Sequence, residues 1–160
     1  MRSSLTYLGV PVRLRPAALL AGVLNALIVG LVTRDRRMAL AAALLWYVAD
    51  GGHVAGHIVS SQVVAAPLTA IDFGLYPKNV YHNDQVSPQQ HIGRASGGVL
   101  ASLLATLVWA LLARAAAPGT IKTLLTIAAI QHGLLGGASL LPIPFVDGGV
   151  IYANLAKIMA

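Results

Sequence analysis

Long uncharged runs alternate with short polar and basic clusters along this chain. Residues 16–33 form the first run, and Arg34-Asp35-Arg36-Arg37 closes it. A helix of that length spans about 27 Å, close to the roughly 30 Å hydrocarbon core of a bilayer. We therefore interpret it as a retained transmembrane helix. The alternative, a secretory signal peptide, requires a small-x-small cleavage site, and none precedes the arginine cluster.

The remaining runs extend the same pattern to the end of the chain. They predict an all-α, polytopic membrane protein with about four transmembrane helices in a single membrane domain, residues 1–160. The expected elements are a basic N-terminal segment at 1–15, transmembrane helices at about 16–33, 38–61, 95–113 and 123–146, a polar loop at 72–94, and a short C-terminal helix at 150–160.

The composition agrees with a bilayer as the solvent. The chain has 160 residues, of which 57% are hydrophobic and 10% are charged, against about 25% charged residues in ordinary soluble domains. Its formal net charge of +6 does not indicate nucleic-acid binding, because the basic residues flank the apolar runs. The 11 basic residues divide almost equally between the two faces of a four-helix arrangement, so they do not set the orientation.

Asp147 ends the apolar segment LLPIPFVDGG, residues 140–149, between a double-proline break and two glycines. A charged residue at the centre of a membrane helix costs roughly 2.5–3.5 kcal/mol on insertion scales, so such residues are candidates for function. Irregular backbone at membrane depth occurs where it is buried or lines a cavity. The segment therefore predicts a polar pocket inside the helix bundle.

His53 and His57 lie four residues apart within another apolar run. On a helix this spacing puts both imidazoles on one face, where they can reach a single metal ion. Asp147 supplies a third ligand if the fourth run packs against the second. Two plainer interpretations stay open: the histidines are buried and hydrogen-bonded to neighbouring helices, and Asp147 caps a helix from Gly148 to Ala160.

Two motifs resemble those of the site-2 proteases, a family of intramembrane zinc metalloproteases. His53-Val54-Ala55-Gly56-His57 resembles the family's His-Glu-x-x-His, and residues 140–149 resemble its Asn-Leu-Leu-Pro-x-Pro-x-Leu-Asp-Gly-Gly. Gly97-Gly98 weakly resembles the family's middle motif, Gly-Pro-x-x-Asn. The resemblance covers residues 38–160 and implies a three-helix core in which His53, His57 and Asp147 hold zinc.

The departures from the family pattern concern the catalytic group. The family's glutamate is the general base that activates water, and Val54, which cannot accept a proton, stands at its position. All five acidic residues of the sequence are aspartates. Ser139 replaces the asparagine that opens the second motif. Asp50, one turn before His53, is the alternative as a displaced base, a residue that orients His53, or a fourth ligand.

These residues give three functional hypotheses. The first is a catalytically inactive site-2-protease-like protein, acting as a structural or binding subunit of a membrane complex. The second is an active intramembrane zinc metalloprotease with an unusual base. The third is a pigment- or haem-binding subunit with His53, His57 or His132 as axial ligand.

Further expectations concern the surroundings of the chain and its other histidines. We expect the bilayer and other membrane subunits as partners, and the cytoplasmic (inner) membrane of a prokaryote as the location. Gly98 and Ser102 have the spacing of close helix contacts. His132 is expected to make an interhelical hydrogen bond, and His82 and His91 to be solvated.

Overall fold

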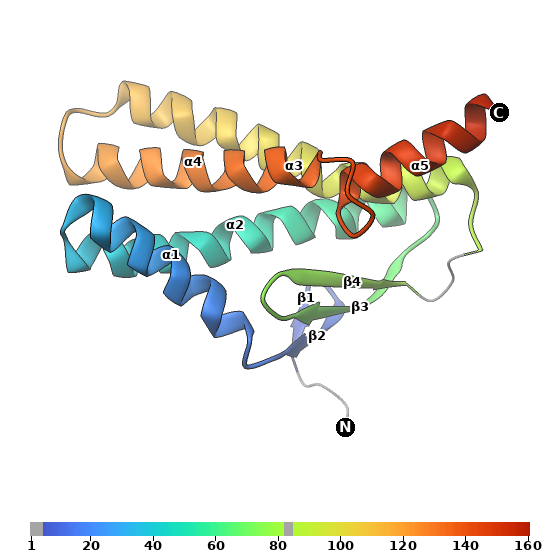
Figure 1. Ribbon diagram of the computed structural model, residues 1–160, viewed down its shortest axis with the longest axis horizontal. Helices are drawn as coiled ribbons and strands as arrows, with labels where there is room; N and C mark the ends of the chain where they lie inside the picture. Colours follow the sequence, from blue (N-terminus) through green and yellow to red (C-terminus); the bar gives the residue numbers. More distant parts are fainter. Residues whose placement is uncertain (1–4, 82–84) are drawn as a thin grey trace.

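The computed structural model describes residues 5–81 and 85–160, which form five helices and four short strands (Figure 1). His82, singled out from the sequence, lies outside the described residues. The elements are β1 (Thr6–Tyr7), β2 (Val10–Leu14), α1 (Ala18–Thr33), α2 (Arg36–Val63), β3 (Leu68–Phe73), β4 (Pro77–Tyr81), α3 (Pro88–Ala115), α4 (Thr120–Ser139) and α5 (Asp147–Met159).

The helices form the larger part of the molecule. Helices α2, α3 and α4 pack against one another, α1 lies against α2, and α5 lies against α3. In Figure 1 the three long helices run along the longest axis, with the α1–α2 and α3–α4 turns at the same end. The contacts between α2, α3 and α5 build the candidate site.

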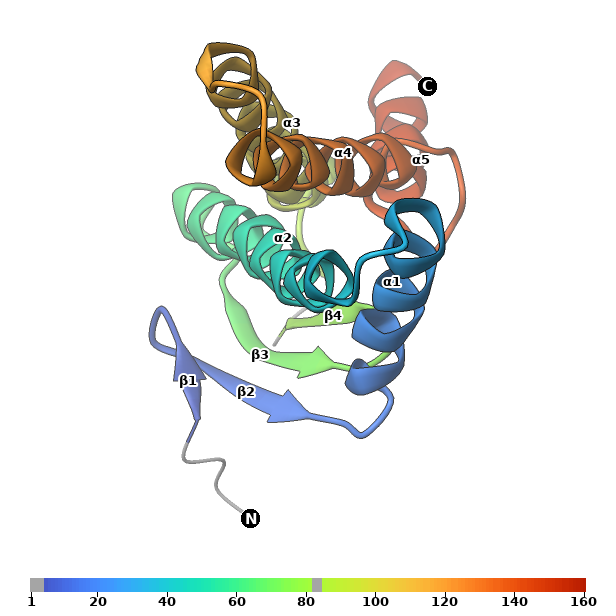
Figure 2. The ribbon, with the colours of Figure 1, turned by 90° about the vertical axis from the view of Figure 1, so that its left-hand side faces the viewer.

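A small sheet lies on the side of α2 that faces away from α3 and α4 (Figure 2). Its order is β1-β2-β3-β4. Strands β2 and β3 are parallel and are joined through α1 and α2, whereas β1–β2 and β3–β4 are antiparallel. An apolar cluster joins sheet and helix: Val10, Val12, Val54, Ile58, Leu68 and Ile71.

Local chemistry explains where the helices begin. The Asp35 carboxylate accepts hydrogen bonds from the backbone N–H groups of Arg37 and Met38, at 2.7 and 3.4 Å, and so caps α2. Ser87 and Gln90 form a reciprocal capping box at the start of α3, where Pro88 takes the first helical position. The Asp35 cap lies where a polar cluster meets an apolar run, whereas the Ser87 cap lies within the polar segment that precedes Ala95.

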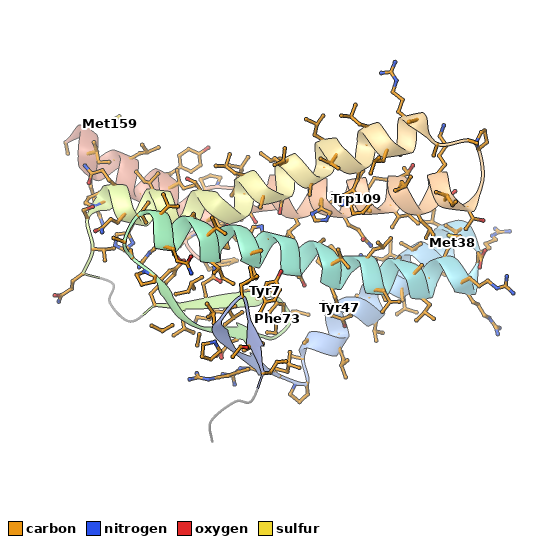
Figure 3. All side chains as sticks on the ribbon, turned by 180° about the vertical axis from the view of Figure 1, so that it is seen from behind. Tyr7, Met38, Tyr47, Phe73, Trp109 and Met159 are labelled. Atoms are coloured by element: carbon orange, nitrogen blue, oxygen red, sulfur yellow. The ribbon has the colours of Figure 1, made fainter. Side chains whose placement is uncertain are left out.

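The outward faces of the helices carry many large apolar side chains, as Figure 3 shows along their whole length. Helices α2 and α3 are long and apolar enough to cross a membrane, and only 28% and 22% of their apolar windows are buried inside the molecule. The core helix of a soluble protein would be mostly buried. These exposed apolar faces therefore indicate a membrane protein, with α1 as a shorter apolar helix.

The expected all-α, polytopic fold is confirmed in part: the chain is largely helical and has helices apolar enough to span a membrane, but the expectation missed the sheet. Strands β1 and β2 lie in the expected basic segment 1–15, and β4 lies in the expected polar loop 72–94. The alternation that marks β2 covers only five residues and includes Pro11, which disfavours a strand. The apolar β3 sequence could not be distinguished from the end of a helix by its pattern.

Two expected helix boundaries were also wrong. Helix α3 begins at Pro88 rather than at residue 95, because its capping box makes the polar residues before Ala95 helical. Helix α4 ends at Ser139, and residues 140–146 form the connection to α5. Four membrane crossings remain a prediction, since two of the described helices are long and apolar enough to span the bilayer.

Candidate metal centre

Three side chains from two helices converge on one point. His53 Nε2 and His57 Nε2 on α2 are 3.0 Å apart. The Oδ2 atom of Asp147, at the start of α5, lies 3.2 Å from the first of these nitrogens and 3.3 Å from the second. Both histidine side chains are almost fully buried, and the Asp147 side chain is 17% exposed. The structure thus brings together the three residues that the sequence predicted as ligands.

The spacing of these atoms is close to that of three ligands on a tetrahedral zinc ion. With zinc–ligand bonds of about 2.0–2.2 Å, neighbouring ligand atoms lie about 3.3–3.6 Å apart, slightly farther than the 3.0–3.3 Å found here. Two imidazole nitrogens and one carboxylate oxygen are common zinc ligands, and three protein ligands leave the fourth position open. The donor set therefore fits the metal that the motifs imply.

The orientation of His57 is set by α3. Its Nδ1 atom lies 2.8 Å from the carbonyl oxygen of Arg94. A carbonyl can only accept, so Nδ1 carries the proton, and in the neutral ring Nε2 presents its lone pair to His53 and Asp147. This is the form in which a histidine binds metal, and a carbonyl on the other ring nitrogen is a usual partner of such a ligand.

His53, on α2, is held by a hydroxyl of α3. Its Nδ1 atom lies 2.9 Å from Ser102 Oγ, and Ser102 is fully buried. When this Nδ1 donates to the hydroxyl, both Nε2 lone pairs and a carboxylate oxygen face one another at 3.0–3.3 Å. Three electron-rich atoms at that distance require a positive charge between them, from a cation or from a proton on His53 Nε2.

Gly98 makes room for the two rings. A Cβ atom at this position would collide with His57 Nε2 and would lie 2.7 Å from His53 Nε2. No other residue type fits without displacing the candidate ligands. The predicted close contact at Gly98 and Ser102 therefore exists, and it faces α2 of the same chain.

The double-proline segment positions Asp147. The connection from Leu140 to Val146 folds back on the first turn of α5, so closely that a Cβ atom at Gly148 would collide with the Leu140 backbone. The alternative interpretation, in which Asp147 caps a helix from Gly148 to Ala160, was wrong: α5 begins at Asp147, and no side chain caps its N-terminus. The carboxylate is directed to the histidines.

Val54 is fully buried in the apolar cluster between α2 and the sheet. The cavity beside the candidate ligands is lined by other residues. Valine at this position thus contributes to the hydrophobic core, and its side chain offers no group that could accept a proton.

The other candidates from the sequence do not join the triad. Asp50 is buried one turn before His53. Among the described residues, the ligand atoms that lie close together belong to His53, His57 and Asp147, and Asp50 is not one of this group. His132 is also buried, and its Nδ1 atom has no hydrogen-bond partner among the described residues. The interhelical hydrogen bond expected of His132 is therefore not seen at this atom.

A cavity of about 760 Å³ opens beside the triad. Its lining includes His53, His57 and Asp147, together with Ser139 from the second motif. His91, which was expected to be a solvated loop residue, lies on α3, lines this cavity, and accepts a hydrogen bond from Arg94 at Nδ1. The volume is within the usual range for small-ligand sites.

Neither a protein-family model nor a curated protein matches the sequence. Among solved structures, the site-2 protease from Methanocaldococcus jannaschii matches with a TM-score of 0.76 and 18% sequence identity, over 96% of this chain and 70% of that chain. This chain has the site-2 protease fold. The resemblance drawn from the two motifs is confirmed at the level of the fold, and the sheet belongs to the matched region because almost the whole chain is covered.

Within this site-2 protease fold, sequence reasoning found the three candidate ligands but missed the residues that hold them. Ser102 and Gly98 carried a signal, the spacing of small residues, but that signal does not say which side chains they meet. The Arg94 carbonyl carried none, because a backbone acceptor is not visible in a sequence.

Proposed function

We propose that this chain is a catalytically inactive membrane protein of the site-2 protease fold, which retains a metal ion and acts as a binding or structural subunit of a membrane complex. The observation that supports it is the pairing of a complete ligand triad with an apolar residue at the position of the catalytic base. His53, His57 and Asp147 converge, whereas Val54 is buried in the core.

Zinc is the metal that the donor set favours. When bound, it would supply a Lewis acid with one open position for an oxygen or nitrogen atom of a ligand. The residues of the chain determine the rest: the Arg94 carbonyl and Ser102 orient the two rings, and Gly98 leaves space for them. Such a centre supports binding of a ligand without its hydrolysis.

The active-protease alternative depends on Asp50 as the base. This carboxylate does not line the cavity, and it is not part of the close ligand group among the described residues.

The pigment-binding alternative requires a histidine that lines a cavity in which a cofactor could bind. His132 does not line the cavity either, and the Nε2 atoms of His53 and His57 are directed at each other and at Asp147.

Metal content and cleavage activity test the proposal together. The purified protein is expected to contain about one zinc ion per chain, which the His53→Ala, His57→Ala double variant loses. Wild-type protein is expected to leave membrane-peptide substrates intact with or without a chelator. Chelator-sensitive cleavage that disappears in Asp50→Ala would establish the active enzyme instead.

The membrane setting belongs to the same proposal. We infer a location in the cytoplasmic (inner) membrane of a prokaryote, with other membrane subunits as partners. The exposed apolar faces of α2 and α3 support an integral membrane protein. Purification in a mild detergent after crosslinking tests for partners, and a chain recovered only as a monomer contradicts the subunit role.

A further inference from the structure

Five basic residues gather at one end of the helix bundle. Residues 34–37 join α1 to α2, residues 114–122 include the α3–α4 turn, and both turns lie at the same end (Figure 1). Gln131 on α4 holds three of these helices together, because its amide donates to Asn25 Oδ1 on α1 and to the Ala42 carbonyl on α2, at 2.7 and 2.9 Å. We call the five basic residues the turn cluster: Arg34, Arg36, Arg37, Arg114 and Lys122.

The charge of the turn cluster is not balanced by acidic side chains nearby. Asp35 is the one acid in residues 34–37 and 114–122, and its carboxylate caps α2. Within residues 5–81 and 85–160, no ion pair includes a member of the cluster. The four arginines are exposed and Lys122 is partly exposed. Nitrogen-bearing side chains point outward at this end, which Met38 marks in Figure 3, so the end of the bundle is a positively charged surface.

The folding preferences of the helices do not explain these cations. Arg36 and Arg37 stand in the first turn of α2, and Lys122 stands in the first turn of α4, where the helix dipole disfavours positive charge. Arg34 follows α1 with a φ of 54°, in the left-handed region that favours glycine or asparagine. Arg114 alone suits its place, in the last turn of α3. The other four basic residues therefore lower the stability of the fold, which favours a role in binding.

Basic residues elsewhere are engaged or isolated. Arg13 and Arg15 form ion pairs with Asp72, at 3.6 and 2.8 Å. Arg94 is buried, and Lys157 is a single charge near the end of α5. Among the described residues, exposed basic side chains that lack an acidic partner are thus grouped at the turn cluster.

Large apolar side chains are exposed directly beside the turn cluster. Leu31 and Val32, at the end of α1, are 78% and 80% exposed, and Leu111 on α3 and Ile121 on α4 are exposed as well. A soluble anion would use the charges alone. A phospholipid uses both features, because its headgroup meets the basic side chains while its acyl chains cover the apolar surface next to them.

We propose that the turn cluster binds the headgroup of an anionic phospholipid, whose acyl chains lie against the exposed apolar residues of α1, α3 and α4. The site lies about 25 Å along α2 from His53. It is therefore separate from the candidate metal centre, and it goes beyond the proposed function by adding a second ligand to the molecule.

Native mass spectrometry of the delipidated full-length protein in detergent tests the proposal. Dioleoyl phosphatidylglycerol and dioleoyl phosphatidylcholine share their acyl chains and differ in the net charge of the headgroup. A basic residue near an anionic lipid surface contributes about fivefold in affinity, so we expect the first lipid to bind at least about tenfold more tightly. The preference should shrink as the salt concentration rises, because exposed charges are screened. Equal binding of the two lipids, a comparison that requires no substitution, overturns the proposal.

The double variant Arg36→Gln, Arg37→Gln removes two charges of the turn cluster and should reduce the preference by about tenfold or more. Its matched control is Arg13→Gln, Lys157→Gln, which changes the net charge equally but away from the cluster and should keep the wild-type preference. Loss of positive charge from the first turn of α2 does not weaken the helix, and far-UV circular dichroism checks this. Full preference in the first variant, or an equal loss in both, contradicts the turn cluster as the site.

Water-soluble competitors identify the occupant. Glycerophosphoglycerol is the same headgroup without acyl chains, and hexaglutamate represents an acidic protein segment. We expect neither, in large excess, to displace bound phosphatidylglycerol. Displacement by the first would indicate a soluble phosphate ester, and displacement by the second an acidic protein partner. Either result overturns the lipid as the occupant.

Zinc content separates this inference from the proposed function. A protein that takes up no zinc but prefers phosphatidylglycerol contradicts the retained metal and supports the lipid site. A protein that holds zinc at His53 and His57 but binds both lipids equally contradicts the lipid site alone.

Discussion

Residue 98 determines whether the two imidazole rings can approach each other. Only a hydrogen atom fits between the α3 backbone and the Nε2 atoms of His53 and His57. This requirement is independent of which ion the site binds. It makes Gly98 a more specific marker of an intact site than the histidines, because a His-x-x-x-His pair occurs in many helices for other reasons.

Gly98→Ala should therefore impair metal binding although it changes no ligand. We expect zinc affinity to fall by about tenfold to hundredfold, as for other changes that reorient a ligand from outside the metal shell, with an overpacking cost of about 1–3 kcal/mol in the free energy of unfolding. Competition with a chromogenic chelator measures the affinity. Gly137→Ala on α4 is the control, since nothing lies within 4 Å of its added Cβ. Equal loss in both variants would contradict a specific role for Gly98.

The sequence pattern predicted the three ligands but not the groups that orient them. His53 and His57 follow from helical spacing, and Asp147 follows from a costly charge in an apolar segment. The Ser102 hydroxyl and the Arg94 carbonyl act across an interhelical contact. Their positions depend on the rotation of α3 about its axis, and the apolar pattern of α3 does not fix that rotation because apolar residues surround the helix.

Among the elements, the two central strands of the sheet are linked by an ion pair at Asp72. Asp72 on β3 receives a hydrogen bond from Arg15 at 2.8 Å and faces Arg13 on β2 at 3.6 Å. The hydrogen bond from Arg15 and the nearby basic charges hold the pKa of Asp72 below its usual value. Both arginine side chains are 61% exposed, so the contribution is small.

This ion pair predicts a pH-dependent effect of Asp72→Asn. A carboxyl whose pKa is lower in the folded state stabilises the fold above its unfolded pKa of about 3.9, and that contribution is lost as the pH falls through the lower folded pKa. The variant should be less stable than wild type at pH 7, by less than about 1 kcal/mol, with a smaller difference near pH 3. Chemical denaturation at both pH values measures this. In an Arg15→Gln background, the effect of Asp72→Asn on stability should depend less on pH. If Asp72→Asn lowers the stability equally at both pH values, the ion pair is excluded as the cause.

The elements also show which parts of a fold are visible in a sequence. The long helices were predicted because each apolar run exceeds the length of a helix in a small soluble core. The strands were not predicted, because β1 and β2 together contain few residues. They are stabilised by contacts with α2, such as the hydrogen bond that the Tyr7 hydroxyl donates to the Gly51 carbonyl at 3.1 Å. Such a contact joins segments far apart in the chain.

For the molecule as a whole, the membrane assignment requires that the exposed apolar helix faces contact lipid. The sequence contains no cysteine, so single cysteines can be introduced without background. Leu107 on α3 is 56% exposed, and Arg37 at the start of α2 is also exposed. We expect Leu107→Cys to resist a membrane-impermeant maleimide in intact vesicles and in vesicles open on both sides, because a thiol in hydrocarbon is not ionised.

Arg37→Cys is the control and should react once both sides of the membrane are accessible. In detergent, the difference in the rate of maleimide modification between the two variants should be smaller, and Arg37→Cys should still react faster than Leu107→Cys. Rapid modification of Leu107→Cys in intact and open vesicles would show that this face of α3 is in contact with water, which would contradict the membrane assignment.

The parallel pairing of β2 with β3 has a consequence for the order in which the chain assembles during synthesis. Val12 pairs with Ile71, and α1 and α2 lie between them. Strand β2 therefore has no β3 to pair with until both helices have been made. Asp147 is made later still, so the three ligands meet only after α2, α3 and α4 have been made. A chain that carries metal at this site is thus one in which α2 and α5 have come together, and bound zinc would serve as a record of that contact.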